Sequence, residues 1–537
     1  MKSLVVVTLG GLLWNAAGCL DLSGEASQDS EVSAADDAAG ATEASEATET
    51  SELDMASSFE DVVARHTDER GRMANHVAVR DASGAFATAS AHGAIDLDNE
   101  FFQDLGGNGR RCVSCHVPTV GWTITPHQLR ETFEETDGGA FDDGLGLGAV
   151  FRPVDGANAP NADVSSKEKR RQAYSMLLNK GVIRVGLPVP ANAEFELVAV
   201  DDPYHYASAA ELSLFRRPLP TTNLKFISTV MWDGREVVPG ASVLSELETQ
   251  SSDAVVGHAQ AQPLSAAQRT SIAQFEMALA SAQIYDHRAK DLHADGAMGG
   301  PAEILATPFH IGINDNFGDR ETGAPFTPDV FTVYERWARG GEGQGDDRGD
   351  DDRDGRHGKG WYGWGHGHDD AGFRNAEARR AIARGEALFN RKPITITGVS
   401  GINDEAVFGK PATLVGSCST CHDTPNGGSH SVVAPLNIGI SDASRRTADM
   451  PLYTLRNKAT GEIVKTTDPG RALIDGKWSH IGRFKGPTLR NLAPRAPYFH
   501  NGSAADLEAV VEFYNERFHV GFTRQEKSDL VAFLRSL

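Results

Sequence analysis

Two short strings of cysteine and histidine are the residues of this chain best suited to chemistry. They read Cys112-Val-Ser-Cys115-His116 and Cys418-Ser-Thr-Cys421-His422. A two-residue gap sets two thiols at the spacing of the haem vinyl groups, and the adjacent imidazole can then reach the iron. A Cys-x-x-Cys pair alone would also suit a zinc or redox site, but the following histidine, present twice, favours haem. We therefore predict two covalently bound haem c groups, with His116 and His422 as proximal ligands.

The composition places these strings in a globular, acidic chain. The 537 residues allow about two to four domains. Hydrophobic residues make up 40% and charged residues 23%, which excludes a chain disordered throughout. The net charge of −23 argues against nucleic acid as a partner, because phosphate contacts need positive charge. Four of the five cysteines belong to the two strings, so haem attachment at both leaves no pair for a disulfide.

The N-terminus has the pattern of an export signal. Lys2 precedes an apolar run, and the small residues before Cys19 resemble a bacterial lipoprotein cleavage box. We predict a signal peptide at 1–18 and a lipid anchor on Cys19 that attaches the protein to a membrane; the alternative is ordinary cleavage nearby with Cys19 unmodified. Residues 19–58 are predicted to be an acidic disordered tether. The expected location is periplasmic or outer-membrane-anchored.

A second low-complexity segment, 336–372, is rich in Asp, Gly and His. Closely spaced aspartates could bind calcium and the histidines a transition metal, but the Asp spacing does not fit an EF-hand loop. We interpret the segment as a solvated surface insertion. A helical pattern follows at 375–389 and leads toward the second haem string.

Internal repetition indicates two copies of one haem-binding unit. Residues 264–279 align without a gap with 522–537, and each stretch is predicted to be an amphipathic helix capped by Ser265 or Thr523. Upstream, the string at 232–235 matches 500–503, and a haem string precedes each. We predict a mainly α fold with two cytochrome-c-like haem domains in tandem, long irregular loops and little β-structure. We expect one domain at 59–335 and the other at 373–537, each with one haem.

The sixth iron position decides between chemistry and electron transfer. A haem with two strong protein ligands transfers electrons, whereas an open position can bind peroxide or dioxygen. The repeat places His258 near the distal face of the first haem, because Tyr514 occupies the corresponding stretch of the second copy. A generic surface histidine is the alternative reading of His258.

The residues resemble the bacterial di-haem cytochrome c peroxidases and the related MauG-type enzymes. The resemblance covers about 95–335 and 375–537 and is most specific at both haem strings, the Trp-Asp-Gly-Arg string at 232–235 and the segments 484–491 and 497–502. It implies a peroxide-reducing haem held by His116 and an electron-storing haem held by His422. It also implies Trp232 between the haems and a small electron-donor protein, either a cytochrome c or a cupredoxin.

Three departures from the family pattern matter. Where the peroxidases have a Met ligand this chain has Tyr514, as MauG-type relatives do; Met450 and His519 are rival ligands. The family's distal acid corresponds to the region of Glu246 and Glu248, and His258 could replace it.

The third departure concerns calcium. The Asn that helps bind calcium in the family aligns with Pro218, which argues against a calcium site here unless backbone carbonyls supply the ligands.

The predicted function is reduction of hydrogen peroxide at the N-terminal haem, with His258 or Glu248 moving the proton and Trp232 relaying electrons. One alternative is MauG-like or rubber-oxygenase-like oxidation of a macromolecular substrate, which Tyr514 favours. The other alternative is a non-enzymatic di-haem electron carrier.

Overall fold

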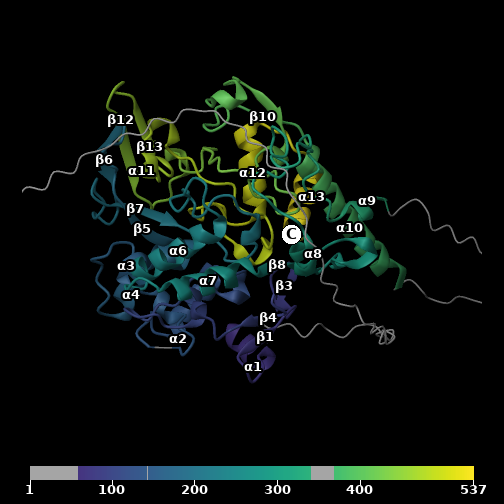
Figure 1. The fold of residues 1–537 in the computed structure, drawn as a ribbon, viewed down its shortest axis with the longest axis horizontal. Coiled ribbons are helices and arrows are strands. Elements are labelled where there is room, and N and C mark those ends of the chain that lie inside the picture. Colours follow the sequence, from purple (N-terminus) through teal and green to yellow (C-terminus); the bar gives the residue numbers. More distant parts are fainter. Residues whose placement is uncertain (1–57, 142, 340–367) are drawn as a thin grey trace, which may run out of the picture. The chain divides into compact units, whose positions relative to one another are not determined.

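The computed structural model describes residues 58–141, 143–339 and 368–537 (Figure 1). These residues belong to one compact unit. The predicted signal peptide with Cys19, nearly all of the predicted tether and most of the predicted insertion lie outside the described residues. Within the described ranges, no helix combines the length and the apolar character that a membrane crossing requires.

Helices make up 34% of the structure and strands 16%, so helix is the main regular structure but the strand content exceeds the little that was expected. The helices are α1 (Phe59–His66), α2 (Pro126–Glu135), α3 (Pro153–Gly156), α4 (Lys167–Ala173), α5 (Ser175–Lys180), α6 (Val243–Gly257), α7 (Ala266–Met277), α8 (Pro301–Ala306), α9 (Glu335–Arg339), α10 (His368–Arg391), α11 (Ala472–Asp475), α12 (Leu507–Phe518) and α13 (Arg524–Arg535).

The repeated helices predicted at 264–279 and 522–537 are present as α7 and α13. The hydroxyl of Ser265 accepts a hydrogen bond from the amide of Gln268, and that of Thr523 from the amide of Glu526, so each helix begins with a capping box. α7 packs against α6 and α13 packs against α12, which gives each half a similar helix pair.

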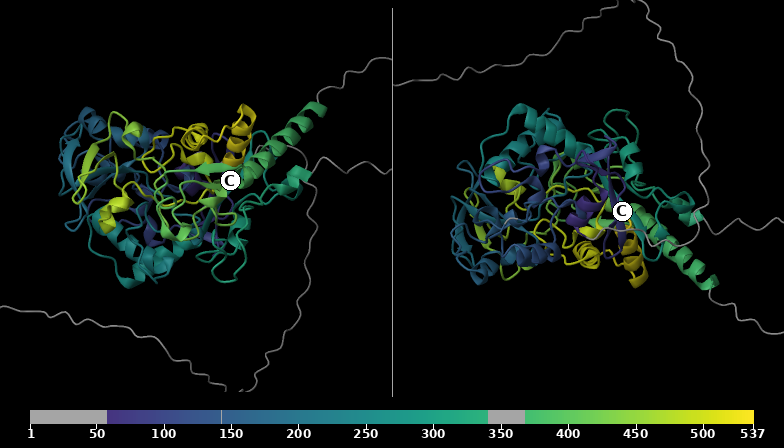
Figure 2. Two further views of the ribbon diagram at one scale, coloured as in Figure 1. Left: turned by 90° about the horizontal axis from the view of Figure 1, so that it is seen from above. Right: turned by 90° about the horizontal axis from the view of Figure 1, so that it is seen from below.

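The long helix α10 confirms the helical pattern predicted at 375–389 and extends it at both ends. It packs along α13, and both views of Figure 2 show it as a straight green rod at one side of the unit. A Cβ atom at Gly385 would lie 2.1 Å from the carbonyl oxygen of Asp529. The close approach of the two helices therefore requires glycine at this position.

Within the described part of the chain, the strands form five small antiparallel sheets. In their hydrogen-bonded order these are β1 (Arg72–Ala74) with β4 (Ala94–Asp96); β2 (Val79–Arg80), β3 (Gly84–Ser90), β8 (Leu279–Asp286) and β9 (Lys290–Asp291); β5 (Ile183–Leu187) with β7 (Leu212–Arg216); β13 (Ile463–Thr466), β12 (Leu452–Asn457) and β6 (Phe195–Asp201); and β10 (Ile394–Ile396) with β11 (Leu414–Gly416).

One of these sheets joins the two halves of the chain, because β6 pairs with β12 from Phe195 opposite Asn457 to Asp201 opposite Leu452. A buried charge cluster reinforces this junction. Arg216 forms ion pairs with Asp233, next to Trp232, and with Asp468 of the second half, and all three side chains are buried. Arg216 therefore ties the 232–235 string to the C-terminal half.

Each haem string lies against a cluster of aromatic rings. In the first half, Phe101 contacts Phe102, Trp122 and Phe275, and its ring centroid lies 6.3 Å from that of His116. In the second half, Phe389 contacts Phe331 and Phe533, and its centroid lies 6.1 Å from that of His422. Two separate apolar cores thus support the two strings.

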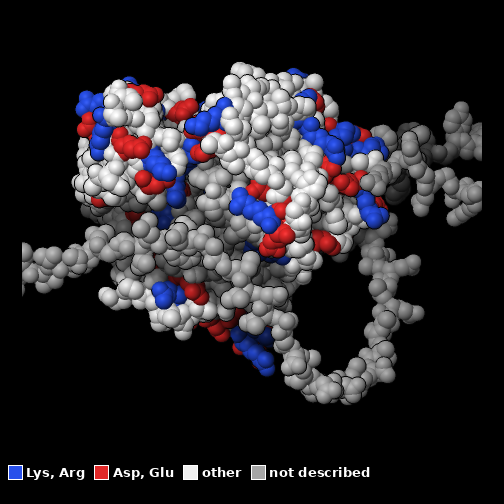
Figure 3. Space-filling view, turned by 45° about the horizontal axis from the view of Figure 1, so that its top comes forward, with Lys and Arg blue, Asp and Glu red and all other residues white. Residues whose placement is uncertain are grey.

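Charges of both signs are interspersed on the face of the unit drawn in Figure 3. Eleven of the 74 acidic residues lie in 20–58, a stretch with no Lys or Arg. Part of the large negative net charge therefore belongs to this segment and not to the compact unit.

Candidate functional site

Both haem strings fold into the same local turn. Cys112–Ser114 and Cys418–Thr420 are short 3-10 helices, η2 and η8. In η2 the amide of His116 donates to the carbonyl of Cys112 at 3.0 Å, and in η8 the amide of His422 donates to that of Cys418 at 3.1 Å. Among the described residues no disulfide is present, so all four thiols are free. Each string therefore presents two thiols and one imidazole from a single turn.

The two histidines are held alike. His116 Nδ1 lies 3.3 Å from the carbonyl oxygen of Trp122, and His422 Nδ1 lies 2.6 Å from that of Gly428, each six residues further along the chain. With the proton on Nδ1, such a bond leaves the lone pair on Nε2, as an iron ligand requires. Burial lowers the pKa of His116 and of His422 to about 4, so both rings are neutral at neutral pH.

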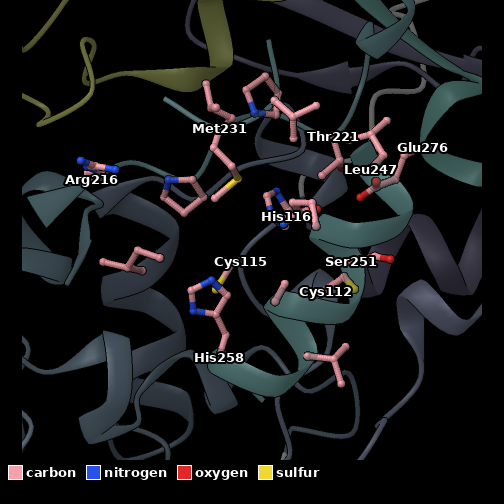
Figure 4. A pocket seen from close by; sticks show the side chains of 18 of the residues that line it. Cys112, Cys115, His116, Arg216, Thr221, Met231, Leu247, Ser251, His258 and Glu276 are labelled. Atoms are coloured by element: carbon pink, nitrogen blue, oxygen red, sulfur yellow. The ribbon is translucent and has the colours of Figure 1, made fainter. Parts of the chain in front are cut away.

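Hollow 1 is the cavity beside the first string, and it encloses about 1340 Å³ of empty space, including the part open to solvent. Figure 4 shows the side chains that line it. The predicted site residues that this hollow brings together are Cys112, Cys115, His116, Trp232 and His258. The structure therefore places His258 in the wall of the same cavity as the first haem string.

His258 is fixed by its surroundings. It caps the C-terminus of α6, its carbonyl accepts from Asn108 and Arg110, and its Nδ1 lies 2.7 Å from Asp155 Oδ2. Asp155 also lines hollow 1 and has a positive φ of 58°, an unusual conformation for a residue other than glycine. This carboxylate fixes the orientation of the ring. The sequence carried no signal for Asp155, because it lies 103 residues before its partner.

The two glutamates considered as the distal acid lie outside this cavity. Glu248 Oε1 accepts a hydrogen bond from Thr270 at 2.7 Å, between α6 and α7. Glu246 is buried and accepts from the amide of Val238 at 2.9 Å. Neither side chain lines hollow 1. The structure instead brings Glu276 of α7 into the wall, a residue that the sequence analysis did not single out.

Hollow 2 lies beside the second string and encloses about 1660 Å³ of empty space, again including the open part. Cys418, Cys421, His422 and Tyr514 line it together. Burial raises the pKa of the Tyr514 phenol, with a further contribution from the nearby thiols of Cys421 and Cys418. The structure thus places Tyr514 in the same cavity as the second haem string.

The rival ligands of the second iron lie elsewhere. Met450 is buried in a separate apolar cluster with Met176, Val182 and Phe215. His519 is exposed at the C-terminal cap of α12. Neither lines hollow 2. Of the three predicted ligands, the structure therefore brings only Tyr514 to the cavity.

The two hollows share a wall. The residues that line both are Arg217, Pro218, Leu219, Pro220, Trp232 and Lys485. The indole Nε1 of Trp232 donates to the carbonyl of Arg217 at 2.8 Å, which fixes the ring in this wall.

Beyond Trp232, an aromatic path continues toward hollow 2. The ring of His500 meets the indole edge-on at a centroid distance of 6.2 Å and stacks on Phe484 at 4.0 Å. Phe484 lines hollow 2. Trp232 therefore connects one cavity with the other.

Pro218, which occupies the position of the family's calcium-binding Asn, lies in this wall. Its carbonyl accepts a hydrogen bond from Thr123 Oγ1 at 2.7 Å. Within the described ranges, no three His, Cys, Asp or Glu side chains are grouped so as to hold a metal ion.

Both hollows fit a covalently attached haem. Each combines two free thiols on one turn, a neutral imidazole whose Nδ1 is engaged, and a mostly apolar wall. His116 would hold the iron in hollow 1, and His422 would hold it in hollow 2, where Tyr514 is available on the same cavity wall. This donor set matches c-type haem chemistry better than zinc, since a structural zinc site needs four converging ligands.

Comparisons with known proteins agree with this chemistry. The chain is 32% identical over 132 residues to a cytochrome-c peroxidase of Denitromonas iodatirespirans, covering 23% of this chain and 36% of that protein. It is 30% identical over 139 residues to the cytochrome c551 peroxidase of Nitrosomonas europaea, covering 26% and 35%. It is also 30% identical over 120 residues to the methylamine utilization protein MauG of Paracoccus denitrificans, covering 20% and 27%.

The matched part spans about a third of the length of the first of these relatives. No protein-family model matches the chain. The resemblance inferred from the haem strings and their flanking motifs is nevertheless confirmed: over the matched part, this chain is a relative of the bacterial cytochrome-c peroxidases and of MauG.

Proposed function

We propose that the chain is a di-haem c-type oxidoreductase that reduces hydrogen peroxide in hollow 1 with electrons relayed from hollow 2. The observation that carries this proposal is the shared wall: Trp232 lines both cavities, and each cavity contains a Cys-x-x-Cys-His turn. Two redox centres on either side of one indole suit stepwise electron transfer.

Haem iron, when bound, supplies peroxide binding and the transfer of two electrons. The protein side chains supply the protons. His258 takes a proton from one peroxide oxygen and returns it to the other, which becomes the leaving oxygen. Asp155 holds the ring in one orientation through its contact with Nδ1. The overall reaction consumes two protons and two electrons for each peroxide and forms two waters.

The electrons come from a small reduced donor protein, either a cytochrome c or a cupredoxin. We propose that the donor delivers them at hollow 2 and that Trp232 passes them to hollow 1. Export and a lipid anchor at Cys19 would place both centres where such donors occur, outside the cytoplasm.

A second candidate function rests on Tyr514. A phenolate ligand stabilises ferric and higher states of iron, which favours oxidation of a macromolecular substrate, as in MauG-type or rubber-cleaving enzymes, over electron storage. A purely electron-carrying role is the third possibility and requires that both irons have two protein ligands.

One set of assays separates these functions. We expect purified protein to consume hydrogen peroxide with a reduced small cytochrome as donor, and to show a high-spin ferric signal in its EPR spectrum. Peroxide consumption that is independent of a donor protein would favour the second function. Two low-spin irons that do not react with peroxide, even after reduction, would leave only the carrier role.

A further inference from the structure

Glu276 is a buried carboxyl group in the wall of hollow 1. The residue is 5% exposed, and its side chain forms no hydrogen bond or ion pair among the described residues. It lies one turn after Ile272 on α7, and Figure 4 shows it beside Leu247 and Thr221 with its carboxylate turned toward the cavity. The mechanism above does not use this group.

The internal repeat shows that this carboxyl is specific to hollow 1. In the alignment of 264–279 with 522–537, Glu276 corresponds to Leu534 and Ile272 to Leu530. All four residues line the cavity of their own half. Three are apolar, so the same face of the same helix carries an ionisable group in one cavity only.

An isolated carboxylate is unfavourable in such a place. Moving a charge out of water without a partner is strongly unfavourable, so such a group shifts to its neutral form. Burial accordingly raises the pKa of Glu276 to about 8, so the side chain holds a proton at neutral pH and can release it near that range.

We propose that Glu276 is the redox-linked proton site of hollow 1: it binds one proton when the haem in that cavity gains an electron and releases it when the electron leaves. The inference rests on the proposed function, in that it requires haem in hollow 1. One electron enters from the donor protein and one proton from solvent, so the charge of the cavity is unchanged. The physical cause is electrostatic: a more positive iron disfavours the neutral carboxyl, and by linkage the ionised carboxyl disfavours reduction.

Other charged groups line the same cavity and contribute to its electrostatic potential. The cationic residues are Arg110, Arg111, Arg216, Arg217, Arg235 and Lys485. The remaining titratable groups are Asp155, paired with His258, together with His116 and the thiols of Cys112 and Cys115, which thioether formation removes from titration. Arg216 is paired with Asp233, and Asp155 is paired with His258. Among the described residues, Glu276 is therefore the acidic side chain of this cavity that has no ion-pair partner.

Potentiometric titration of the purified holoprotein between pH 6 and 9 tests the proposal. For wild type we expect the midpoint potential of one haem to fall with pH, by up to about 59 mV per pH unit between the pKa of the carboxyl beside the oxidised haem and its higher pKa beside the reduced haem. The other haem should show no comparable slope. Glu276→Leu, which copies hollow 2, should flatten the slope, and so should Glu276→Gln, which keeps the shape of the side chain.

The reciprocal variant Leu534→Glu should create a pH-dependent potential at the other haem. Glu168→Gln removes an exposed carboxyl and serves as the matched control with an unchanged slope. If two haems are present but Glu276→Gln retains the wild-type slope, the proposal is wrong. Absence of haem from hollow 1, visible in the spectrum of the wild type, would instead overturn the proposed function.

Discussion

His258 Nδ1 and Asp155 Oδ2 lie 2.7 Å apart in the wall of hollow 1, and this pair gives the cavity its best-oriented proton acceptor. We expect His258→Ala to lower kcat/KM for hydrogen peroxide by about 100-fold or more, because a positioned base typically contributes 10²–10⁴-fold. Asp155→Asn should cause a smaller loss, since the ring remains but loses its orienting carboxylate. His519→Ala, at an exposed histidine, is the control. Unchanged peroxide turnover in His258→Ala would remove this residue from the mechanism.

Trp232 lines both hollows, and we expect its indole to carry electrons between the two haems. Trp232→Phe keeps an apolar ring but removes the Nε1 bond to Arg217 and the easily oxidised indole. We expect this substitution to slow electron transfer from hollow 2 to hollow 1 by about tenfold or more, because the electron must then cross between the haems without an intermediate oxidisable ring. Both haems should remain attached. Rapid mixing of the reduced protein with peroxide, followed by absorbance, measures this rate. Trp478→Phe, whose indole bonds Glu462 away from both cavities, should leave the rate unchanged; equal rates in both variants would contradict the relay.

Tyr514 is the predicted sixth ligand that the structure brings to hollow 2. Tyr514→Phe removes the phenol oxygen while keeping the ring that packs between Phe513 and Phe518. We expect the ferric absorption and EPR spectra of one haem to change, because its ligand field changes. Met450→Leu and His519→Ala should leave both spectra as they are. A spectral change in either of those variants, with none in Tyr514→Phe, would reverse the assignment.

Much of this site was predictable because it depends on local spacing. The strings at 112–116 and 418–422 specify their own turn, and the capped helices after Ser265 and Thr523 follow from residues in sequence. The choice among Tyr514, Met450 and His519 was not predictable, since it depends on which segment the fold brings to the cavity.

Contacts between residues far apart in the chain could not be predicted from the sequence either. Asp155 meets His258 across 103 residues, and β6 pairs with β12 across about 250 residues, with no sequence pattern that links either pair. Glu276 is different: a glutamate aligned with Leu534 on the apolar face of a repeated helix was a signal that could have been found from the sequence.

The buried carboxyl also makes stability depend on pH. The folded-state pKa of Glu276 is raised to about 8, above the value near 4.3 in an unfolded chain. Its contribution to stability is therefore fully present below about pH 4.3 and is lost as pH rises toward 8. Relative to Glu276→Leu, the unfolding free energy of wild type should fall by up to about 1.4 kcal/mol per pH unit in this window. Denaturant unfolding at several pH values measures the difference, and parallel curves would contradict a buried acid.

Arg216 should be essential to the junction between the halves. Arg216→Met leaves Asp233 and Asp468 as buried charges without their main partner, a loss of about 3–5 kcal/mol. Arg456→Met breaks an exposed pair with Glu196 that also joins the two halves, and it should cost less than about 1 kcal/mol. Thermal or denaturant unfolding compares the two. Equal effects would mean that the buried cluster does not hold the 232–235 string in place.

The central claim, that two haems are covalently attached in cavities on either side of Trp232, is tested most directly by the intact mass of the denatured protein purified from an exporting bacterial host. We predict a mass that exceeds the processed polypeptide by two haem groups. Cys112→Ser with Cys115→Ser should lose one of them, and so should Cys418→Ser with Cys421→Ser. A wild-type mass with one haem or none, or unchanged masses in both double variants, would contradict the account.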